Sequence, residues 1–194
     1  MSTTAEDVDL VGDDAVENIA RAALFAALIG ACAYVSFPNP LAPQVPVTLQ
    51  VLALFLAGIY LGPVWGGLSM ALYLVAGAAG VPVWSGGAAG IGSLLGPTGG
   101  YLWSYPIAGF VIGFVVHSGL TLRDPNDAGL ARLVGAMVAG TVIVYALGSL
   151  GIYFATPADI VTAVVSGSAA FVPFELAKMA AAVGIVRSDA VAAK

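Results

Sequence analysis

Two charged side chains stand inside an apolar stretch near the end of the chain. Glu175 and Lys178 are the charged residues of the stretch 171–186. Because they are three positions apart, a helix would place both side chains on one face. Charges at membrane depth are costly, so such residues generally face a cavity or a partner. We therefore predict that the pair forms the floor of a small-molecule pocket.

The pair offers hydrogen-bond acceptors and donors side by side. A ligand with adjacent N–H and C=O groups, such as a cyclic urea, could satisfy both side chains. A ligand carboxylate on Lys178 is a second possibility. An ion pair that only joins two helices is a third, although such a pair repays its desolvation poorly.

The sequence gives little support for catalysis. It has no paired-carboxylate site and no histidine–carboxylate metal spacing, and the glycine-rich stretch 86–90 lacks the lysine of a phosphate-binding loop. We therefore expect no enzyme activity, no metal and no cofactor. Two other classes stay open: a small intramembrane enzyme with Glu175 as general base, and an assembly protein in which the pair fixes helix register.

The composition is that of a multi-pass membrane protein. Of 194 residues, 60% are hydrophobic and 9% are charged, against roughly 25% charged in soluble domains. The net charge of −5 makes nucleic acid an unsuitable partner. Acidic residues crowd the start of the chain, so we interpret 1–18 as a disordered cytoplasmic tail. Residues 19–189 would form one membrane domain and 190–194 a short C-terminal tail.

Hydrophobic runs divide this domain into helices, and we predict an all-α fold with six transmembrane helices. Gly62-Pro63 would form a tight helical hairpin, because proline suits the first turn of a helix. Thr156 is predicted to cap a short helix that precedes the last span. The six predicted spans are 19–37, 47–62, 63–79, 101–120, 131–154 and 170–186.

The basic residues predict the orientation. With six spans, Arg21, the Arg123/Arg132 turn and the Arg187/Lys194 tail fall on one side. Positive residues mark the cytoplasmic side, so both termini would be cytoplasmic in a plasma-membrane protein. If the last span enters near residue 170, Glu175 and Lys178 lie roughly 8 and 12 Å along it, in the outer half.

The glycine-rich segment 80–100 carries no charge and joins the third and fourth spans. Apolar, irregular backbone at membrane depth is tolerated where it is covered by protein or lines a cavity. We predict a lid over the pocket. The aromatic residues that follow, Tyr101, Trp103 and Tyr105, fit either an interfacial belt or a wall for the ligand, and His117 is interpreted as an interfacial residue.

The first span carries two rows of small residues, which permit close helix packing. One row is Ala22 and Ala26, and the other is Ala23 and Ala27. Packing within this chain and contact with a partner subunit explain these rows equally well.

Several motifs occurring in order resemble one family. They are the stretches 45–50 (VPVTLQ), 56–63 (LAGIYLGP), 80–87 (GVPVWSGG), 96–102 (GPTGGYL) and 172–178 (VPFELAK). Over residues 21–186, the chain resembles the BioY family, the biotin-specific S components of energy-coupling-factor (ECF) transporters. Each motif alone would be weak, but together they are specific.

The resemblance implies the six-helix S-component fold, with biotin bound near the outer face under the loop between helices 3 and 4. It implies that Glu175 and Lys178 contact the ligand head group. Gly86 stands where some members have asparagine, so Ser85 could replace that contact. The predicted substrate-binding set is Gln50, Trp84, Ser85, Gly86, Tyr101, Glu175 and Lys178.

The resemblance also implies partners in the membrane. Ala22, Ala23, Ala26 and Ala27 would meet a transmembrane coupling subunit (T component), which rests on two ATPase subunits. The S component would capture biotin outside, topple in the membrane and release it to the cytoplasm. An S component for another vitamin is the alternative within this class.

Overall fold

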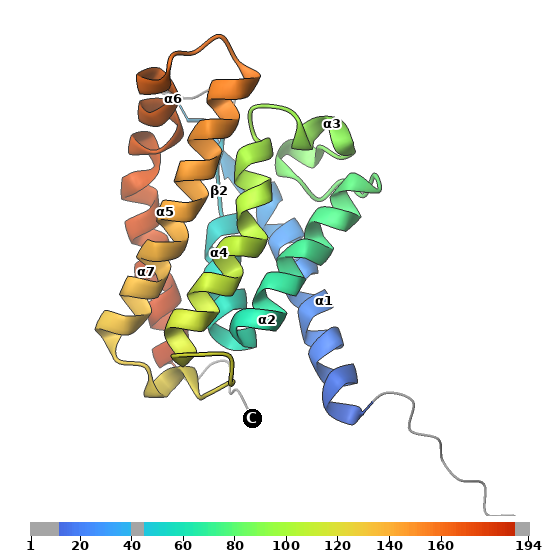
Figure 1. Ribbon diagram of the computed structural model, residues 1–194, viewed down its shortest axis with the longest axis vertical. Coiled ribbons are helices and arrows are strands. Elements are labelled where there is room, and N and C mark those ends of the chain that lie inside the picture. The colour runs from blue at the N-terminus through green and yellow to red at the C-terminus, as the bar shows by residue number, and fades with distance from the viewer. Residues whose placement is uncertain (1–11, 40–44, 189–194) are drawn as a thin grey trace, which may run out of the picture.

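The protein is a bundle of long helices in a computed structural model that describes residues 12–39 and 45–188. Residues 1–11 of the predicted acidic tail and the whole predicted C-terminal tail, 190–194, lie outside the described residues. The principal helices are α1 (Asp13–Tyr34), α2 (Gln50–Ala78), α4 (Gly99–His117), α5 (Leu130–Ala155), α6 (Ile160–Gly167) and α7 (Val172–Arg187) (Figure 1). The shorter elements are β1 (Ser36–Phe37), β2 (Val47–Thr48), α3 (Ile91–Leu94) and the 3₁₀ turns η1 (Ser85–Gly87), η2 (Pro125–Asp127) and η3 (Ala169–Phe171).

Helix α2 consists of two arms that fold back on each other. Gly62 has φ 72° and ψ −173°, which interrupts the helix, and Pro63 follows it. The arms lie close together, since a Cβ on Gly66 would come within 3.1 Å of the Gly58 Cα. Glycine is suited to both tasks because it tolerates a positive φ and allows close approach. The predicted hairpin is confirmed.

Five helical stretches of the described chain are long and apolar enough to cross a membrane. The second of these is α2, and counting its two arms separately gives six passes. The predicted all-α, six-helix membrane fold is therefore confirmed. Helix α1 begins at Asp13, earlier than the predicted start of the first span at Ile19.

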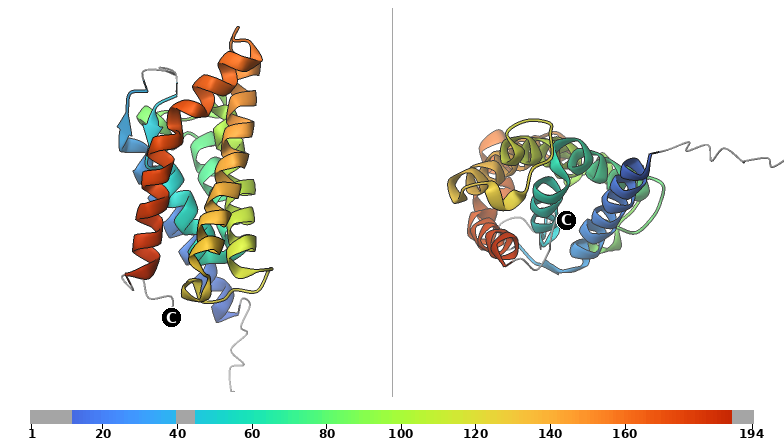
Figure 2. Two further views of the ribbon diagram at one scale, coloured as in Figure 1. Left: turned by 90° about the vertical axis from the view of Figure 1, so that its left-hand side faces the viewer. Right: turned by 90° about the horizontal axis from the view of Figure 1, so that it is seen from below.

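The two ends of the bundle differ, and both are visible in Figure 1. At the hairpin end, where α2 turns at Gly62, both α1 begins and α7 ends (Figures 1 and 2). At the lid end lie β2, α3 and the glycine-rich segment 80–98. Arg187 ties α7 to the hairpin end by donating to the backbone oxygens of Asn126 (2.8 Å) and Ala128 (2.6 Å).

His117 is buried at the hairpin end, so its interpretation as an interfacial residue was wrong. Its Nδ1 accepts the backbone N–H of Arg123 at 3.0 Å, which leaves Nε2 to donate to the Ile59 carbonyl at 2.9 Å. Only 1% of the residue is exposed. The ring is buried because both nitrogens find backbone partners, and it joins α4 to the α2 hairpin.

The short helix predicted before the last span is present as α6, but its cap differs from the prediction. Asp159, not Thr156, caps α6: its Oδ1 accepts the backbone N–H groups of Val161 (2.9 Å) and Thr162 (3.0 Å). The Thr162 hydrogen bonds also lower the pKa of the Asp159 carboxyl. Thr156 instead closes α5 by donating to Ile152.

Helices α6 and α7 follow one another along one side of the bundle (Figure 2). Together they form an apolar stretch of 28 residues, Ile160–Arg187. Glu175 and Lys178 lie just past the middle of this stretch, whereas an entry near residue 170 predicts them in the outer half.

Candidate functional site

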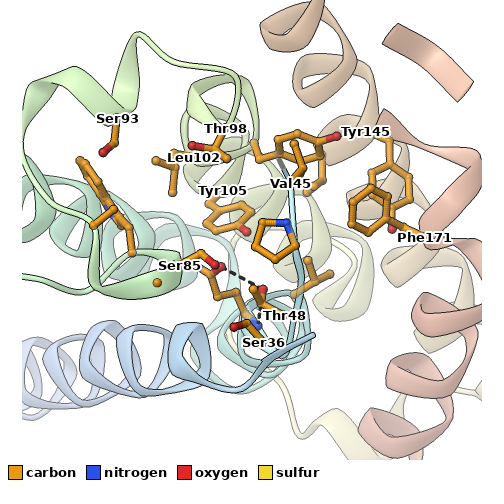
Figure 3. A pocket seen from close by; sticks show the side chains of 18 of the residues that line it. Ser36, Val45, Thr48, Ser85, Ser93, Thr98, Leu102, Tyr105, Tyr145 and Phe171 are labelled. Carbon is orange, nitrogen blue, oxygen red and sulfur yellow. Dashed lines mark hydrogen bonds between the residues drawn. The ribbon is translucent and has the colours of Figure 1, made fainter. Parts of the chain in front are cut away.

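A cavity of about 350 Å³ lies at the lid end. This is at the lower end of the roughly 300–1,000 Å³ range of small-molecule pockets. Its wall comes from β2 and the start of α2, from the lid, and from α4, α5, η3 and α7. Figure 3 shows Tyr145 and Phe171 on one side and the lid residues Ser85 and Ser93 on the other, with Tyr105 between them. All seven residues of the predicted substrate-binding set line this cavity.

The charged pair lies in the first two turns of α7 and faces the cavity. Lys178 Nζ donates to Glu175 Oε1 at 2.6 Å. Glu175 is 3% exposed and Lys178 6%. Glu175 Oε2 has no hydrogen-bond partner among the residues that the structure describes. The two side chains are thus paired with each other and still present an unused acceptor beside a hollow.

The sequence left open whether the aromatic residues at the start of α4 form an interfacial belt or a wall for the ligand, and the structure separates them. Tyr101 and Tyr105 line the cavity, whereas Trp103 is 54% exposed and points away from it. The Tyr101 ring lies against α5 at Gly148, where a Cβ would come within 2.3 Å of it. Its hydroxyl donates to the Gly167 carbonyl at 2.7 Å, which ties α4 to the end of α6.

Gln50 begins α2, and its side-chain amide makes one hydrogen bond at each end within the chain. Its Oε1 accepts from the Thr48 hydroxyl at 2.9 Å, and its Nε2 donates to the Tyr73 hydroxyl at 2.6 Å. Tyr73 in turn donates to the Val83 carbonyl at 3.2 Å. Gln50 therefore connects the β2 wall of the cavity to the root of the lid.

The lid segment is anchored by a tryptophan. Trp84 is 2% exposed and its ring occupies the space above Gly77, where a Cβ would come within 2.2 Å. The Tyr34 hydroxyl of α1 donates to the neighbouring Pro82 carbonyl. Gly86 has φ 70°, a left-handed conformation that favours glycine. The Ser85 hydroxyl is buried at the cavity without a hydrogen-bond partner in the described ranges 12–39 and 45–188.

The two alanine rows of α1 face different ways. Ala22 and Ala26 are buried, at 5% and 8% exposure, and the Ala22 carbonyl accepts the Ser69 hydroxyl of α2 at 2.8 Å. This row therefore packs within the chain and is not available to a partner. Ala23 and Ala27 are exposed, so they are what remains of the predicted partner-binding set.

Sequence reasoning missed Tyr145 of α5. It lines the cavity, is 9% exposed, and its ring lies 5.7 Å from that of Phe171. The available signal was a tyrosine in the middle of an apolar span, since a buried tyrosine hydroxyl usually needs a partner.

Comparisons with known proteins agree on one family. The profile of the BioY family matches residues 2–193. The biotin transporter BioY of Thermotoga maritima is 37% identical over 168 residues, which cover 86% of this chain and 92% of that protein. The biotin transporter BioY of Rhizobium etli is 32% identical, with 83% of this chain and 86% of that protein covered.

A solved structure supports the same conclusion. A crystal structure described as the S-component for biotin from an ECF-type ABC transporter matches with a TM-score of 0.81 and 27% sequence identity. The match covers 92% of this chain and 93% of the other. Fold, family profile and relatives thus agree with the resemblance seen in the motifs, and the chain belongs to the BioY family.

Proposed function

We propose that this protein is the biotin-binding S component of an ECF-type importer. The observation that carries the proposal is the buried Glu175–Lys178 pair beside a cavity of about 350 Å³. The matching relatives are named as biotin transporters, and the matching solved structure as an S-component for biotin. A transporter component is therefore favoured over an intramembrane enzyme.

The chemistry of biotin fits the wall of the cavity. Its cyclic urea carries N–H donors beside a C=O acceptor, which complement the Glu175 carboxylate and hydroxyl or ammonium donors. Its sulfur-containing ring is apolar and suits the apolar part of the lining, to which Leu102, Val144 and Phe171 contribute side chains. Its carboxylate tail would reach the lid, where the buried Ser85 hydroxyl offers a hydrogen bond.

Delivery would depend on partners. The exposed row Ala23 and Ala27 on α1 offers a flat surface on which the helix of a T component could pack closely. The T component would in turn rest on ATPase subunits that drive release. The basic residues Arg21, Arg123, Arg132 and Arg187 favour placing the hairpin end, and both chain termini, at the cytoplasmic side of the plasma membrane. The lid end would then open outward.

The direct test is a biotin titration of the purified protein in nanodiscs. The unaltered protein should bind biotin, and riboflavin or thiamine should not compete. Lys178→Ala should weaken binding at least about tenfold, or ~1.4 kcal/mol, because it removes the partner that holds Glu175. Arg132→Ala, at an exposed position of α5, is the matched control and should leave the affinity unchanged.

Mass spectrometry of the released ligand completes the test. Recovery of unchanged biotin supports a binding protein, whereas a chemically altered product would favour the intramembrane enzyme. Unchanged affinity in Lys178→Ala would remove the charged pair from the site.

A further inference from the structure

Two unused hydrogen-bonding groups meet at the α5–α7 side of the cavity. One is Glu175 Oε2 and the other is the Tyr145 hydroxyl; neither has a regular hydrogen bond to any described residue. Both residues are more than nine-tenths buried, at 3% and 9% exposure. A buried polar group that is left without a hydrogen-bond partner destabilises the protein. Two such groups lining one cavity therefore point to a guest that satisfies both.

Both residues line the cavity, and the Tyr145 hydroxyl lies near enough to the Glu175 carboxylate for a weak hydrogen bond, although its geometry falls outside that of a regular one. The Tyr145 ring is fixed by its packing against Phe171, with ring centroids 5.7 Å apart and an interplanar angle of 38°. The carboxylate is fixed by Lys178, whose ammonium holds Oε1 at 2.6 Å. An acceptor and a hydroxyl donor are thus held side by side at the cavity wall.

The other tyrosine hydroxyls near the cavity are less suited to this task. Tyr101 already donates to the Gly167 carbonyl, and Tyr73 donates to Val83 while accepting from Gln50. Gln50 itself is used on both ends of its amide. Among the described tyrosines that line the cavity, Tyr145 is the one whose buried hydroxyl lacks a regular hydrogen-bond partner, and the Ser85 hydroxyl, in the same state, lies on the lid side.

Resting on the proposed function, we propose that Tyr145 donates to the ureido carbonyl of bound biotin while Glu175 Oε2 accepts a ureido N–H. Lys178 then acts mainly by holding the carboxylate through Oε1. This assigns a specificity-determining contact to α5, a helix that carries none of the residues of the predicted substrate-binding set. A cyclic urea fits because its N–H and C=O groups are adjacent, as Glu175 and Tyr145 are.

The test compares biotin with 2-thiobiotin, in which sulfur replaces the ureido oxygen and accepts hydrogen bonds weakly. Tyr145→Phe keeps the ring and its packing on Phe171 but removes the hydroxyl. It should weaken biotin binding about five- to tenfold, the range expected for one hydrogen bond. The preference of the protein for biotin over 2-thiobiotin should fall by about the same factor.

Tyr153→Phe is the matched control, because Tyr153 is on the same helix, is 41% exposed and does not line the cavity. Tyr153→Phe should leave the affinities for biotin and for 2-thiobiotin within about twofold of those of the unaltered protein. Thermal unfolding of both variants should match that of the unaltered protein, which separates a lost contact from a lost fold.

Two outcomes would overturn the assignment, and they are distinguishable. If Tyr145→Phe keeps the full preference for biotin over 2-thiobiotin, Tyr145 does not contact the carbonyl, whatever it does to Glu175. If the unaltered protein binds no biotin, the proposed function itself fails and this assignment fails with it.

Discussion

Helices α2 and α4 lie side by side, and the two ends of their contact are built from opposite kinds of residue. Toward the hairpin end, glycines meet: a Cβ on Gly109 would come within 3.0 Å of the Gly66 carbonyl oxygen, and one on Gly113 within 2.4 Å of the Gly62 carbonyl carbon. Toward the lid end, tyrosines stand between the helices, with the rings of Tyr73 and Tyr105 stacked 6.3 Å apart. Side-chain size along this helix pair thus differs between the closely packed hairpin end and the lid end, where the cavity lies.

The comparison has a functional meaning. Without a hydrophobic driving force in lipid, helices associate through close packing, which the glycine contacts provide. At the other end the aromatic residues Tyr101 and Tyr105 line the cavity, so the ligand would occupy a region where the helices meet through large side chains. A larger side chain should therefore lower the stability of the fold at the hairpin end and prevent ligand binding at the lid end.

The largest effect is expected at the hairpin end. In Gly113→Val, the new Cβ would lie 2.4 Å from backbone atoms of Gly62 and Pro63, which cannot move without opening the α2 turn. We expect the free energy of unfolding to fall by about 3 kcal/mol, measured by thermal unfolding in detergent. Gly135→Val is the control, because a Cβ at Gly135 meets nothing within 4 Å. If the two variants were equally stable, close glycine packing would not be what stabilises the hairpin end.

A similar increase in volume at the lid end should spare the fold and remove binding. Val144 lines the cavity and is 1% exposed, so the larger side chain of Val144→Phe would enter space that the ligand needs. Biotin affinity should fall more than about tenfold, while the unfolding temperature stays near that of the unaltered protein. Val142→Phe, at a position 62% exposed on the same helix, should bind normally. A destabilised Val144→Phe would show that this region is packed and not hollow.

A smaller effect is expected where the lid joins the bundle. A Cβ in Gly77→Ala would come within 2.2 Å of the Trp84 ring, so the lid root must shift while the cavity floor stays intact. We expect biotin to dissociate about threefold faster, measured by displacement of labelled ligand. Gly92→Ala is the control, since a Cβ there meets nothing within 4 Å. An unchanged dissociation rate would mean that the anchoring of Trp84 does not govern ligand release.

Much of this architecture could be predicted from local patterns. Hydrophobic runs located the spans, and Gly62-Pro63 located the hairpin, because both depend on short-range preferences of the backbone. Glu175 and Lys178 stood out because charges are rare in apolar helices. Their place beside a cavity follows from the same cost of burial.

Other features depend on contacts between distant segments, which the sequence does not reveal. The exposure of Ala22 and Ala23 differs because α2 covers one side of α1, although the two residues are chemically identical. His117 is buried because the backbone of Ile59, 58 positions away, provides a partner. Tyr145 could be assigned to the cavity only once α7 was placed against α5.

The chain secures α6 and α7 at two distant points, through Tyr101 at the Gly167 carbonyl and through Arg187 at the loop before α5. Glu175 and Lys178 lie between these two sets of hydrogen bonds. The width of the cavity therefore depends partly on the Arg187 hydrogen bonds, and Arg187 is a residue that does not line the cavity. Relatives that lack the Arg187 hydrogen bonds should differ in which ligand analogues they accept, even where every residue lining the cavity is the same.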